Sequence, residues 1–394
     1  MAQRTIVIKH FFLVLVLFFD FGCQGHKAPP WVRLPPVRHL SAQDRVLKLR
    51  ESVRIAEREK NYLHVLAGGD VMVGHWTLDF LQQEGADYPF RRLKPVLGNA
   101  EIVFANLEAP FADSGRAVEK RFTFKVPTRF ATGIKQAGIN LLSIANNHIL
   151  DYGMSGLEQT VAALNQAGLH FAGAGMSLEQ AWQPAVLSTP AGTVAMLAFS
   201  MTFPREFWAT DSTGGTAYPY EQKLVQTLDS LRRNVDFVIV SFHWGTEKMQ
   251  TPKDYQVYFA HLAIDHGADL VLGHHPHVLQ GIEIYRNRLI AYSLGNFAFS
   301  SFSRTATQSM LLKVVLHRHG LLFAKIYPLN IDNTMVQFQP RLANEEGKKQ
   351  IIAHIDSLSY ALNAYDIVDD DGLILGSFPG AAEAADRPWV QEKY

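Results

Sequence analysis

The chain has 394 residues, of which 47% are hydrophobic and 19% are charged, as is typical of a globular protein with a sizeable core. This balance excludes an intrinsically disordered chain, and the length suits one large domain or two. Thirty-seven basic and 37 acidic side chains cancel, so no overall positive charge points to a nucleic-acid partner, and we expect none.

The first 23 residues have the features of an export signal. Arg4 and Lys9 supply positive charge, and the apolar run FFLVLVLFF at 11–19 is too short to span a bilayer comfortably. Cys23 follows in FGCQG, which resembles the lipobox of bacterial lipoproteins except that Asp20 stands where that motif has Leu. We expect an exported protein that is membrane-tethered or periplasmic, with Cys23 as the candidate lipidation site; ordinary cleavage, an uncleaved anchor and a buried, inert cysteine are the alternatives.

Residues 24–60 predict a tether that leads into a surface helix. Pro and basic residues dominate 24–40, and 41–60 is charged and compatible with a helix. We place the main domain at 61–335 and a C-terminal helix with an irregular tail at 336–394.

The main domain alternates apolar runs with helical patterns. The predicted strands are 62–70, 101–108, 139–148, 194–200, 236–245 and 268–273. The predicted helices are 128–137, 154–168, 219–234 and 253–267. This alternation predicts an α/β fold with a mainly buried sheet. Two hairpins are expected beyond it, at 278–295 and 309–329, and an amphipathic helix at 347–362.

Side chains suited to bind metals or move protons follow five of the predicted strands. In chain order they are Asp70, Asn106, Glu108, Asn146, Asn147, His148, His243, His275 and His277. The carboxyl ends of strands in an open α/β sheet line one edge, so we expect these groups to meet there. A turn, a cap, a solvated loop or the core would explain each of them separately, but their coincidence indicates a site.

The types of these side chains favour a divalent metal. A thiolate-rich site is excluded by the single cysteine, whereas imidazole and carboxylate together suit Zn, Mn or Fe. Glu108 can bridge two cations, and a pair of cations can activate water and hold both oxygens of a phosphoryl centre. His148 is the candidate catalytic residue, as a general acid or as a group that holds a phosphate oxygen.

Other polar residues are candidates for orienting the ligands or contacting substrate. Glu247 follows Trp244 in HWGTE and Asn296 lies in SLGNF, while Asp151 can orient His148 or cap the next helix. Asn106 and Asn146 join them because each lies beside a predicted ligand.

Several of these segments together resemble one family. AGGDVMVGH, FANLEAPF, SIANNHILDYG, SFHWGTE and GADLVLGHHPHVLQG are similar, in this order, to motifs of the CapA family. These are capsule-synthesis and poly-γ-glutamate-biosynthesis proteins whose domain is related to calcineurin-like metallophosphoesterases. The resemblance implies a four-layer α/β/β/α sandwich. It also implies one ion held by Asp70, Glu108 and His277, and a second held by Glu108, Asn147, His243 and His275.

The sequence departs from the wider superfamily at the first strand. Met72 stands where those enzymes usually have a histidine, and the bridging acid is Glu108 rather than an aspartate. His75, on the same loop, is a weak substitute ligand. These departures put full two-metal hydrolysis in doubt, so one or two ions are expected.

The leading hypothesis is an exported, metal-dependent, phosphoesterase-like hydrolase that acts on an anionic envelope polymer or a phosphate-containing small molecule. The rival is a non-catalytic component of polymer synthesis or export that grips a polyanion in the same groove and works with capsule-synthesis membrane proteins. A third reading is amide chemistry on γ-glutamyl links.

Overall fold

The computed structural model describes residues 41, 43–45, 47, 48, 50 and 62–376. The predicted export segment, Cys23, most of the tether and the end of the tail lie outside these residues. Residues 43–45, 47, 48 and 50 are helical, as predicted for the surface helix. In the part of the chain that the structure describes, no helix is long and apolar enough to cross a membrane.

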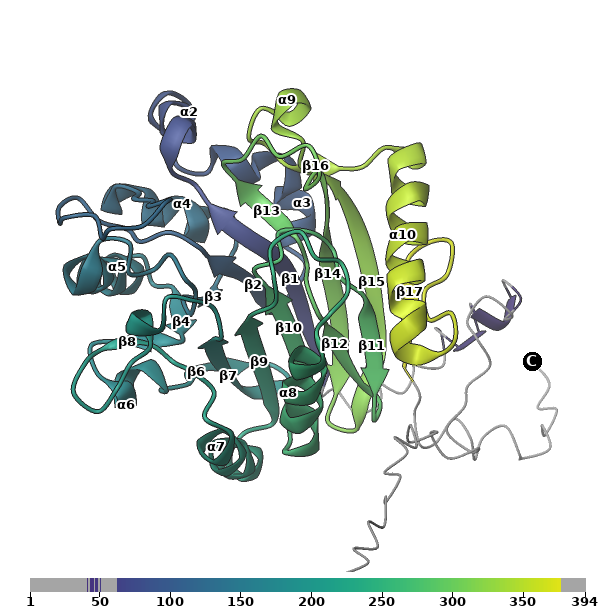
Figure 1. Ribbon diagram of the computed structural model, residues 1–394. Coiled ribbons are helices and arrows are strands. Elements are labelled where there is room, and N and C mark those ends of the chain that lie inside the picture. The colour runs from purple at the N-terminus through teal and green to yellow at the C-terminus, as the bar shows by residue number, and fades with distance from the viewer. Residues whose placement is uncertain (1–40, 42, 46, 49, 51–61, 377–394) are drawn as a thin grey trace, which may run out of the picture. The chain divides into compact units, whose positions relative to one another are not determined.

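Two large sheets form the centre of the body (Figure 1). The first has the order β16-β15-β14-β1-β2-β3-β4, with β13 on β1 and β17 on β15; the second has the order β11-β12-β10-β9-β7-β6. The strands of the first sheet are β1 (Tyr62–Met72), β2 (Ile102–Leu107), β3 (Leu141–Ser143), β4 (His170–Ala172), β13 (Asn296–Phe299), β14 (Gln308–His317), β15 (Gly320–Asn330), β16 (Arg341–Leu342) and β17 (Leu373–Leu375). Those of the second are β6 (Ala185–Thr189), β7 (Gly192–Ser200), β9 (Phe237–His243), β10 (Leu270–His274), β11 (Ile282–Tyr285) and β12 (Arg288–Ala291). A short pair, β5 (Ala174–Gly175) and β8 (Gly215–Thr216), stands apart from both.

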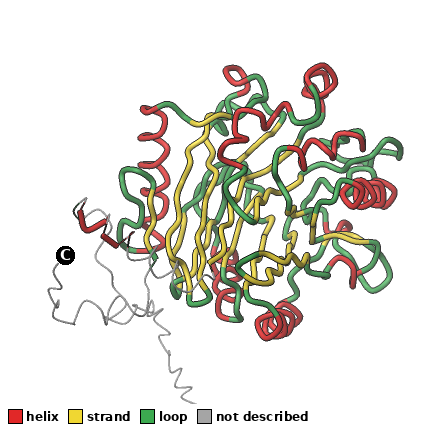
Figure 2. The backbone as a smooth tube through the Cα atoms, turned by 180° about the vertical axis from the view of Figure 1, so that it is seen from behind, coloured by secondary structure: helices red, strands yellow, loops and turns green. Residues whose placement is uncertain are grey.

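Helices cover the outer faces of both sheets, as Figure 2 shows from behind. The helices packed on the first sheet are α2 (Leu78–Glu84), α3 (Lys94–Leu97), α4 (Ala131–Gln136) and α5 (Gly153–Gln166). Those on the second are α6 (Leu178–Ala181), α7 (Glu221–Asn234) and α8 (Asp254–Asp265). The result is the four-layer α/β/β/α sandwich that the resemblance implied.

The strands of the two sheets bury both of their faces. In β9, Phe237 and Ile239 point into the core between the sheets, whereas Val238, Val240 and Phe242 pack under the outer helices. Because successive side chains point to opposite faces, a strand buried on both sides must be apolar throughout. The sequence shows this pattern as an uninterrupted apolar run.

Three details differ from the sequence prediction. The third strand ends at Ser143 rather than at 148, because the Asn146 side chain, instead of a continuing ladder, donates to Leu107 O at 2.7 Å. The two predicted hairpins lie in different sheets: β11 and β12 join the second, and β14 and β15 the first. The third difference concerns the site residues: the strands that they follow belong to both sheets rather than to one edge of a single sheet.

The C-terminal region packs on the body. α9 (Asn333–Val336) follows β15, and α10 (Glu345–Asn363) contacts β11 of one sheet and β15 of the other (Figure 1). Ile351, Ile352 and Ile355 of α10 belong to the core between the sheets. The predicted amphipathic helix thus closes one side of the sandwich.

Candidate metal centre

The first carboxylate of the site is Asp70, near the end of β1. β1 approaches the loop before β13 so closely that a Cβ on Gly69 would stand 1.8 Å from Gly295 O, so only glycine fits there. Asp70 is fully buried, and its Oδ1 accepts a hydrogen bond from Asn106 Nδ2 at 2.8 Å. Its Oδ2 accepts one from the backbone N–H of His275 at 3.3 Å, which links the two sheets.

The second carboxylate is Glu108, immediately after β2. It is fully buried, and its Oε1 has no hydrogen-bond partner among the described residues. Oε1 lies 3.6 Å from Nε2 of both His243 and His277. A buried carboxylate oxygen without a hydrogen bond is costly unless a cation neutralises it.

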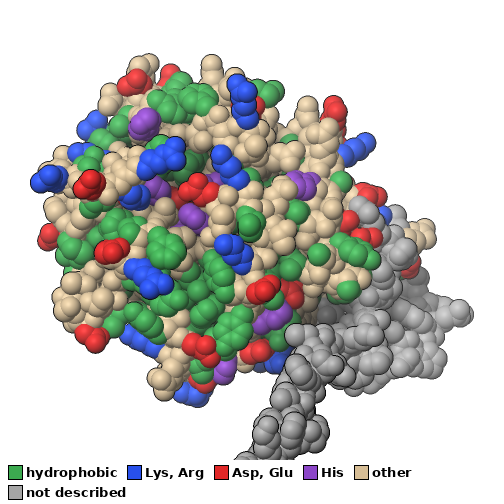
Figure 3. Space-filling model, in the orientation of Figure 1, with side chains coloured by type: hydrophobic (Ala, Val, Ile, Leu, Met, Phe, Trp, Pro, Cys, Tyr) green, Lys and Arg blue, Asp and Glu red, His purple; other side chains and the backbone are tan. Residues whose placement is uncertain are grey.

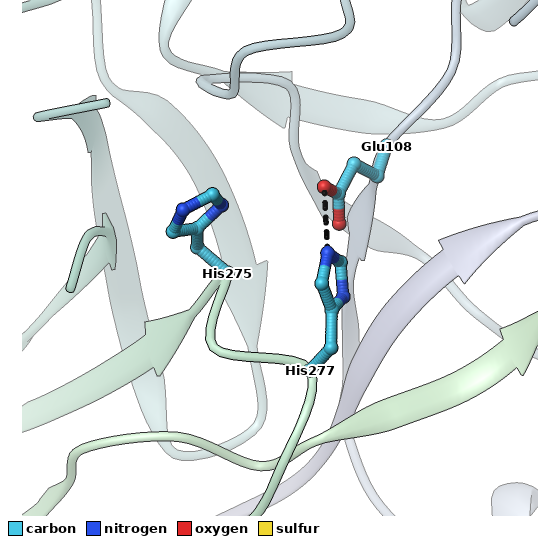
Figure 4. Close-up of side chains that lie close together, drawn as sticks. All are labelled: Glu108, His275 and His277. Atoms are coloured by element: carbon cyan, nitrogen blue, oxygen red, sulfur yellow. Dashed lines mark ion pairs between the residues drawn. The ribbon is translucent and has the colours of Figure 1, made fainter. Parts of the chain in front are cut away.

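The histidines reach the carboxylates from the second sheet. His243 ends β9, and the loop after β10 carries His275 and His277 on either side of Pro276. The two loop histidines have φ values of 95° and 57°, the left-handed backbone that non-glycine residues rarely adopt. Both rings consequently lie on the side of the loop that faces Glu108 (Figure 4). Strain of this kind is typical of functional sites.

The donor set fits a divalent cation. Ligand atoms of Asp70, Glu108 and His243 all lie within 4.8 Å of one another, and so do those of Glu108, His275 and His277. Nδ1 of His275 is buried and, like Glu108 Oε1, has no hydrogen-bond partner in the described part of the chain. Glu108 is common to both sets, as expected of a bridging ligand. The pairing of His243 with Asp70 and of His275 with His277 differs from the division that the resemblance implied, so the assignment of ligands to individual ions stays a prediction.

The electrostatics of the site also call for positive charge. Burial lowers the pKa of His243 well below its usual value and that of His275 to about 3, so both rings are neutral and able to act as ligands. Burial raises the pKa of Glu108 well above its usual value, and the nearby Asp70 charge adds to this. Burial acts against His277, but the carboxylates of Glu108 and Asp70 outweigh it and raise the pKa of His277 to about 10. In the metal-free protein, therefore, the proton on His277 supplies the charge between the carboxylates.

We expect the metal-free protein to lose stability as the pH rises from about 7 to about 9. The His277 pKa is about 10 in the folded chain and about 6.5 in the unfolded chain, so the folded state binds the extra proton between these values. Its stabilisation is complete below about pH 6.5 and is lost as the pH rises through 10; the raised pKa of Glu108 acts in the same direction. The slope is at most about 1.4 kcal/mol per pH unit for one proton.

Urea unfolding in the presence of a chelator across this pH range measures the slope. His277→Gln removes the titrating group and should flatten the profile, whereas the exposed His75→Gln variant is the matched control and should leave it unchanged. An equally steep profile in His277→Gln would contradict this origin.

Asn147 and His148 occupy the loop after β3. Asn147 Oδ1 lies 2.8 Å from His243 Nε2, so the asparagine contacts a candidate ligand, and its own role as a ligand stays a prediction. His148 is buried, and its Nδ1 lies 2.8 Å from Asp151 Oδ2, which confirms the contact expected of Asp151. Burial lowers the pKa of His148, and the Asp151 carboxylate opposes this.

The remaining asparagines hold the ligands in place. Asn106 Nδ2 lies 2.8 Å from Asp70 Oδ1 and 3.3 Å from His243 Nδ1, and Asn106 Oδ1 accepts from Asn146 Nδ2 at 3.2 Å. Asn296 Oδ1 lies 2.9 Å from His277 Nδ1. Asn296 begins β13 and pairs with Asp70 on β1. Hydrogen bonds of this kind to the other nitrogen of a histidine fix the orientation of its ring.

Three other sequence candidates lie differently. Glu247 is exposed in the turn after β9, and its charge contributes to the raised pKa of Glu108. Met72 is buried, and its Sδ accepts a hydrogen bond from Ser300 Oγ at 3.3 Å. It therefore packs in the core rather than facing the ligands. His75 is exposed, with its ring edge-on to Phe124 at 6.5 Å.

Two further residues near the site have a placement that the sequence does not predict. Lys120 lies in a loop without helix or strand, yet its Nζ is 2.6 Å from Asp151 Oδ1 and 3.1 Å from His148 Nδ1. His274, the last residue of β10, is turned away from the ligands and lies with Nε2 3.3 Å from Gly68 O on the opposite sheet. Only the tertiary structure separates it from its neighbour His275.

Figure 3 shows histidine side chains on one face of the molecule, with lysine, arginine and acidic side chains around them.

Comparisons with known proteins agree on one family. A family model described as "Bacterial capsule synthesis protein PGA_cap" matches residues 64–301. The chain is 31% identical over 285 residues to the capsule biosynthesis protein CapA of Bacillus anthracis, a match that covers 70% of this chain and 69% of that protein. It is 30% identical over 266 residues to the PGA biosynthesis protein CapA of Bacillus subtilis (strain 168), covering 67% and 70%.

Among solved structures, the calcineurin-like phosphoesterase YfkN from Bacillus subtilis is similar at a TM-score of 0.41 and 12% identity, covering 75% of this chain and 97% of that one. A likeness this distant says nothing about the site or its activity.

Proposed function

The chain belongs to the bacterial capsule synthesis protein family, and from this premise we propose that it is a metal-dependent, phosphoesterase-like hydrolase of an envelope molecule. The observation that carries the proposal is the buried Glu108 carboxylate. Its Oε1 accepts no hydrogen bond among the described residues, yet it lies 3.6 Å from Nε2 of both His243 and His277. Structural carboxylates are normally satisfied by donors, whereas this one is left open towards other potential metal ligands.

The residues divide into two roles. Asp70, Glu108, His243, His275 and His277 would hold the metal, which when bound would polarise a phosphoryl oxygen and lower the pKa of water. Asn147 supports this set through His243. His148 would hold a proton or a substrate oxygen at Nε2, because its Nδ1 is already engaged.

Elemental analysis of the purified protein combined with a phosphoester screen tests the proposal. We expect one or two Mn, Zn or Fe ions per chain and turnover of at least one phosphomonoester or phosphodiester. We expect His148→Ala to lower kcat by about 100- to 10,000-fold while leaving the metal content unchanged. A wild-type protein that lacks bound metal and turns over no phosphoester in the screen with any of these metals would contradict the proposal.

One observation favours the rival function, a non-catalytic grip on a polyanion. Met72 has no imidazole to offer an ion, and its side chain is buried against Ser300. His148→Ala and the double variant His243→Ala/His275→Ala separate the two functions in cells that make the polymer. If polymer output survives the first substitution but not the second, metal-dependent binding rather than turnover is required. The amide reading is tested by adding γ-glutamyl peptides to the same screen.

We also propose export and membrane attachment through the N-terminus, beside capsule-synthesis membrane proteins. The support is the charged and apolar sequence before Cys23. Fractionation of cells that express the wild type or Cys23→Ser should show the wild type in the membrane fraction and the variant released. Equal distribution of the two would reject lipidation.

A further inference from the structure

We propose that Lys120 is a positioning residue, which ties the loop 112–126 to the segment 147–151 and holds the His148 ring with Nε2 left for substrate. The inference rests on the function proposed above and adds a part to that site which neither the sequence nor the comparisons assign. It is carried by the contacts that one ammonium group makes.

Three polar atoms surround the Lys120 ammonium. Nζ contacts the backbone oxygen of Asn147, lies 2.6 Å from Asp151 Oδ1 and lies 3.1 Å from His148 Nδ1. The ammonium donates to the Asn147 and Asp151 oxygens, whereas His148 Nδ1 donates its own proton to Asp151 Oδ2 and so does not also accept from Lys120. The Lys120 side chain is only 19% exposed, and Nζ lies 5.5 Å from the centre of the Phe207 ring. With its donors directed inward, Lys120 is not available to grip a substrate anion at the surface.

The loop that carries Lys120 depends on the same carboxylate. This loop has no helix, and its backbone docks where Val118 N donates to Asp151 O at 2.9 Å and Phe124 N donates to Asp151 Oδ2 at 2.7 Å. The Phe124 ring also packs on the His148 ring, with centroids 4.5 Å apart. Lys120 neutralises the buried Asp151 charge at this junction, so the loop and the histidine are fixed together.

The consequence concerns the direction of the His148 ring. Its Nδ1–H donates to Asp151 Oδ2 at 2.8 Å, and Lys120 Nζ donates to the other oxygen of the same carboxylate at 2.6 Å. Without the ammonium, the Asp151 charge is left unbalanced and the carboxylate that orients the ring loses its anchor. A small displacement of a catalytic side chain lowers the rate without removing binding.

Steady-state kinetics on the best phosphoester from the screen tests the proposal. Lys120→Met should lower kcat by about 10- to 100-fold and change KM by less than about threefold. In a His148→Ala background the same substitution should have no further effect on kcat, because Lys120 acts through that ring. Lys120→Arg keeps the charge but not the three contacts, so we expect an intermediate kcat; it takes the place of the Met variant if that variant does not fold.

The matched control is Lys125→Met, in the same loop, whose ammonium lies over the Tyr152 ring at 4.6 Å and should leave kcat unchanged. An equal drop in kcat with and without His148, or no drop in either, would overturn the positioning role.

A measurement without turnover separates this inference from the proposed function. Hydrogen exchange followed by mass spectrometry should show faster exchange at 112–126 and 146–152 in Lys120→Met, with metal content and the other segments unchanged. If the wild type has no activity but these segments loosen, the proposed function fails while the positioning role holds. Unchanged exchange in both segments would refute the positioning role whatever the activity.

Discussion

Glu108→Gln is expected to lower the affinity for Mn²⁺ or Zn²⁺ by about 100-fold or more. Loss of a residue that only orients a ligand lowers metal affinity by about 10- to 100-fold, and loss of a direct ligand should cost more. The same substitution should make the metal-free protein less stable. The Glu108 carboxylate is the largest attraction that raises the pKa of His277, and the amide leaves that buried, protonated ring with the Asp70 charge alone. We expect the free energy of unfolding to fall by about 1 to 3 kcal/mol.

Metal titration and urea unfolding with and without chelator measure the two effects. Glu179→Gln, at an exposed position on α6, is the matched control and should change neither. A Glu108→Gln protein that binds metal normally would show that the carboxylate is a structural residue and would remove the main support for the metal centre.

Asp151→Asn is expected to cost about 3 kcal/mol of stability, the largest loss that we predict from a single polar substitution. The carboxylate is fully buried and accepts from Lys120 Nζ on one oxygen and from Phe124 N on the other. An amide has only one acceptor oxygen, so it must turn its NH₂ group towards one of these donors and leave the mostly buried ammonium without its counter-charge.

A double-mutant cycle with Lys120→Met checks this explanation by chemical denaturation. Asp151→Asn/Lys120→Met should be little less stable than Lys120→Met alone, because the unpaired charge is gone. Asp113→Asn, which removes an exposed carboxylate that accepts from Thr128, is the control and should have a much smaller effect. Additive losses in the double variant would argue against the buried pair.

The sequence predicted the layers and most of the candidate site because both produce a local pattern of apolar and polar residues along the chain. A strand buried on both faces must be apolar throughout, as β9 is, and a polar candidate ligand at its end, such as His243, interrupts that run visibly. Periodicity likewise located α7 and α8 to within two residues.

What the sequence did not predict depends on contacts between distant segments. Lys120 lies in a loop with no periodicity, and its role comes from Asp151, 31 positions away. β3 ends early because a side chain replaces a backbone hydrogen bond, a competition that no apolar pattern records. The two neighbouring histidines of β10 and its loop, His274 and His275, take opposite directions only once two sheets face each other.

The contact between Asp70 Oδ2 and the backbone of His275 joins positions 205 residues apart. Closing so long a segment of chain is slow and entropically costly, so we expect the halves of this centre to meet late in folding. A nascent chain that ends before β10 holds Asp70, Glu108 and His243 but lacks His275 and His277. The complete set of proposed ligands therefore exists only after synthesis and docking of the second layer are complete.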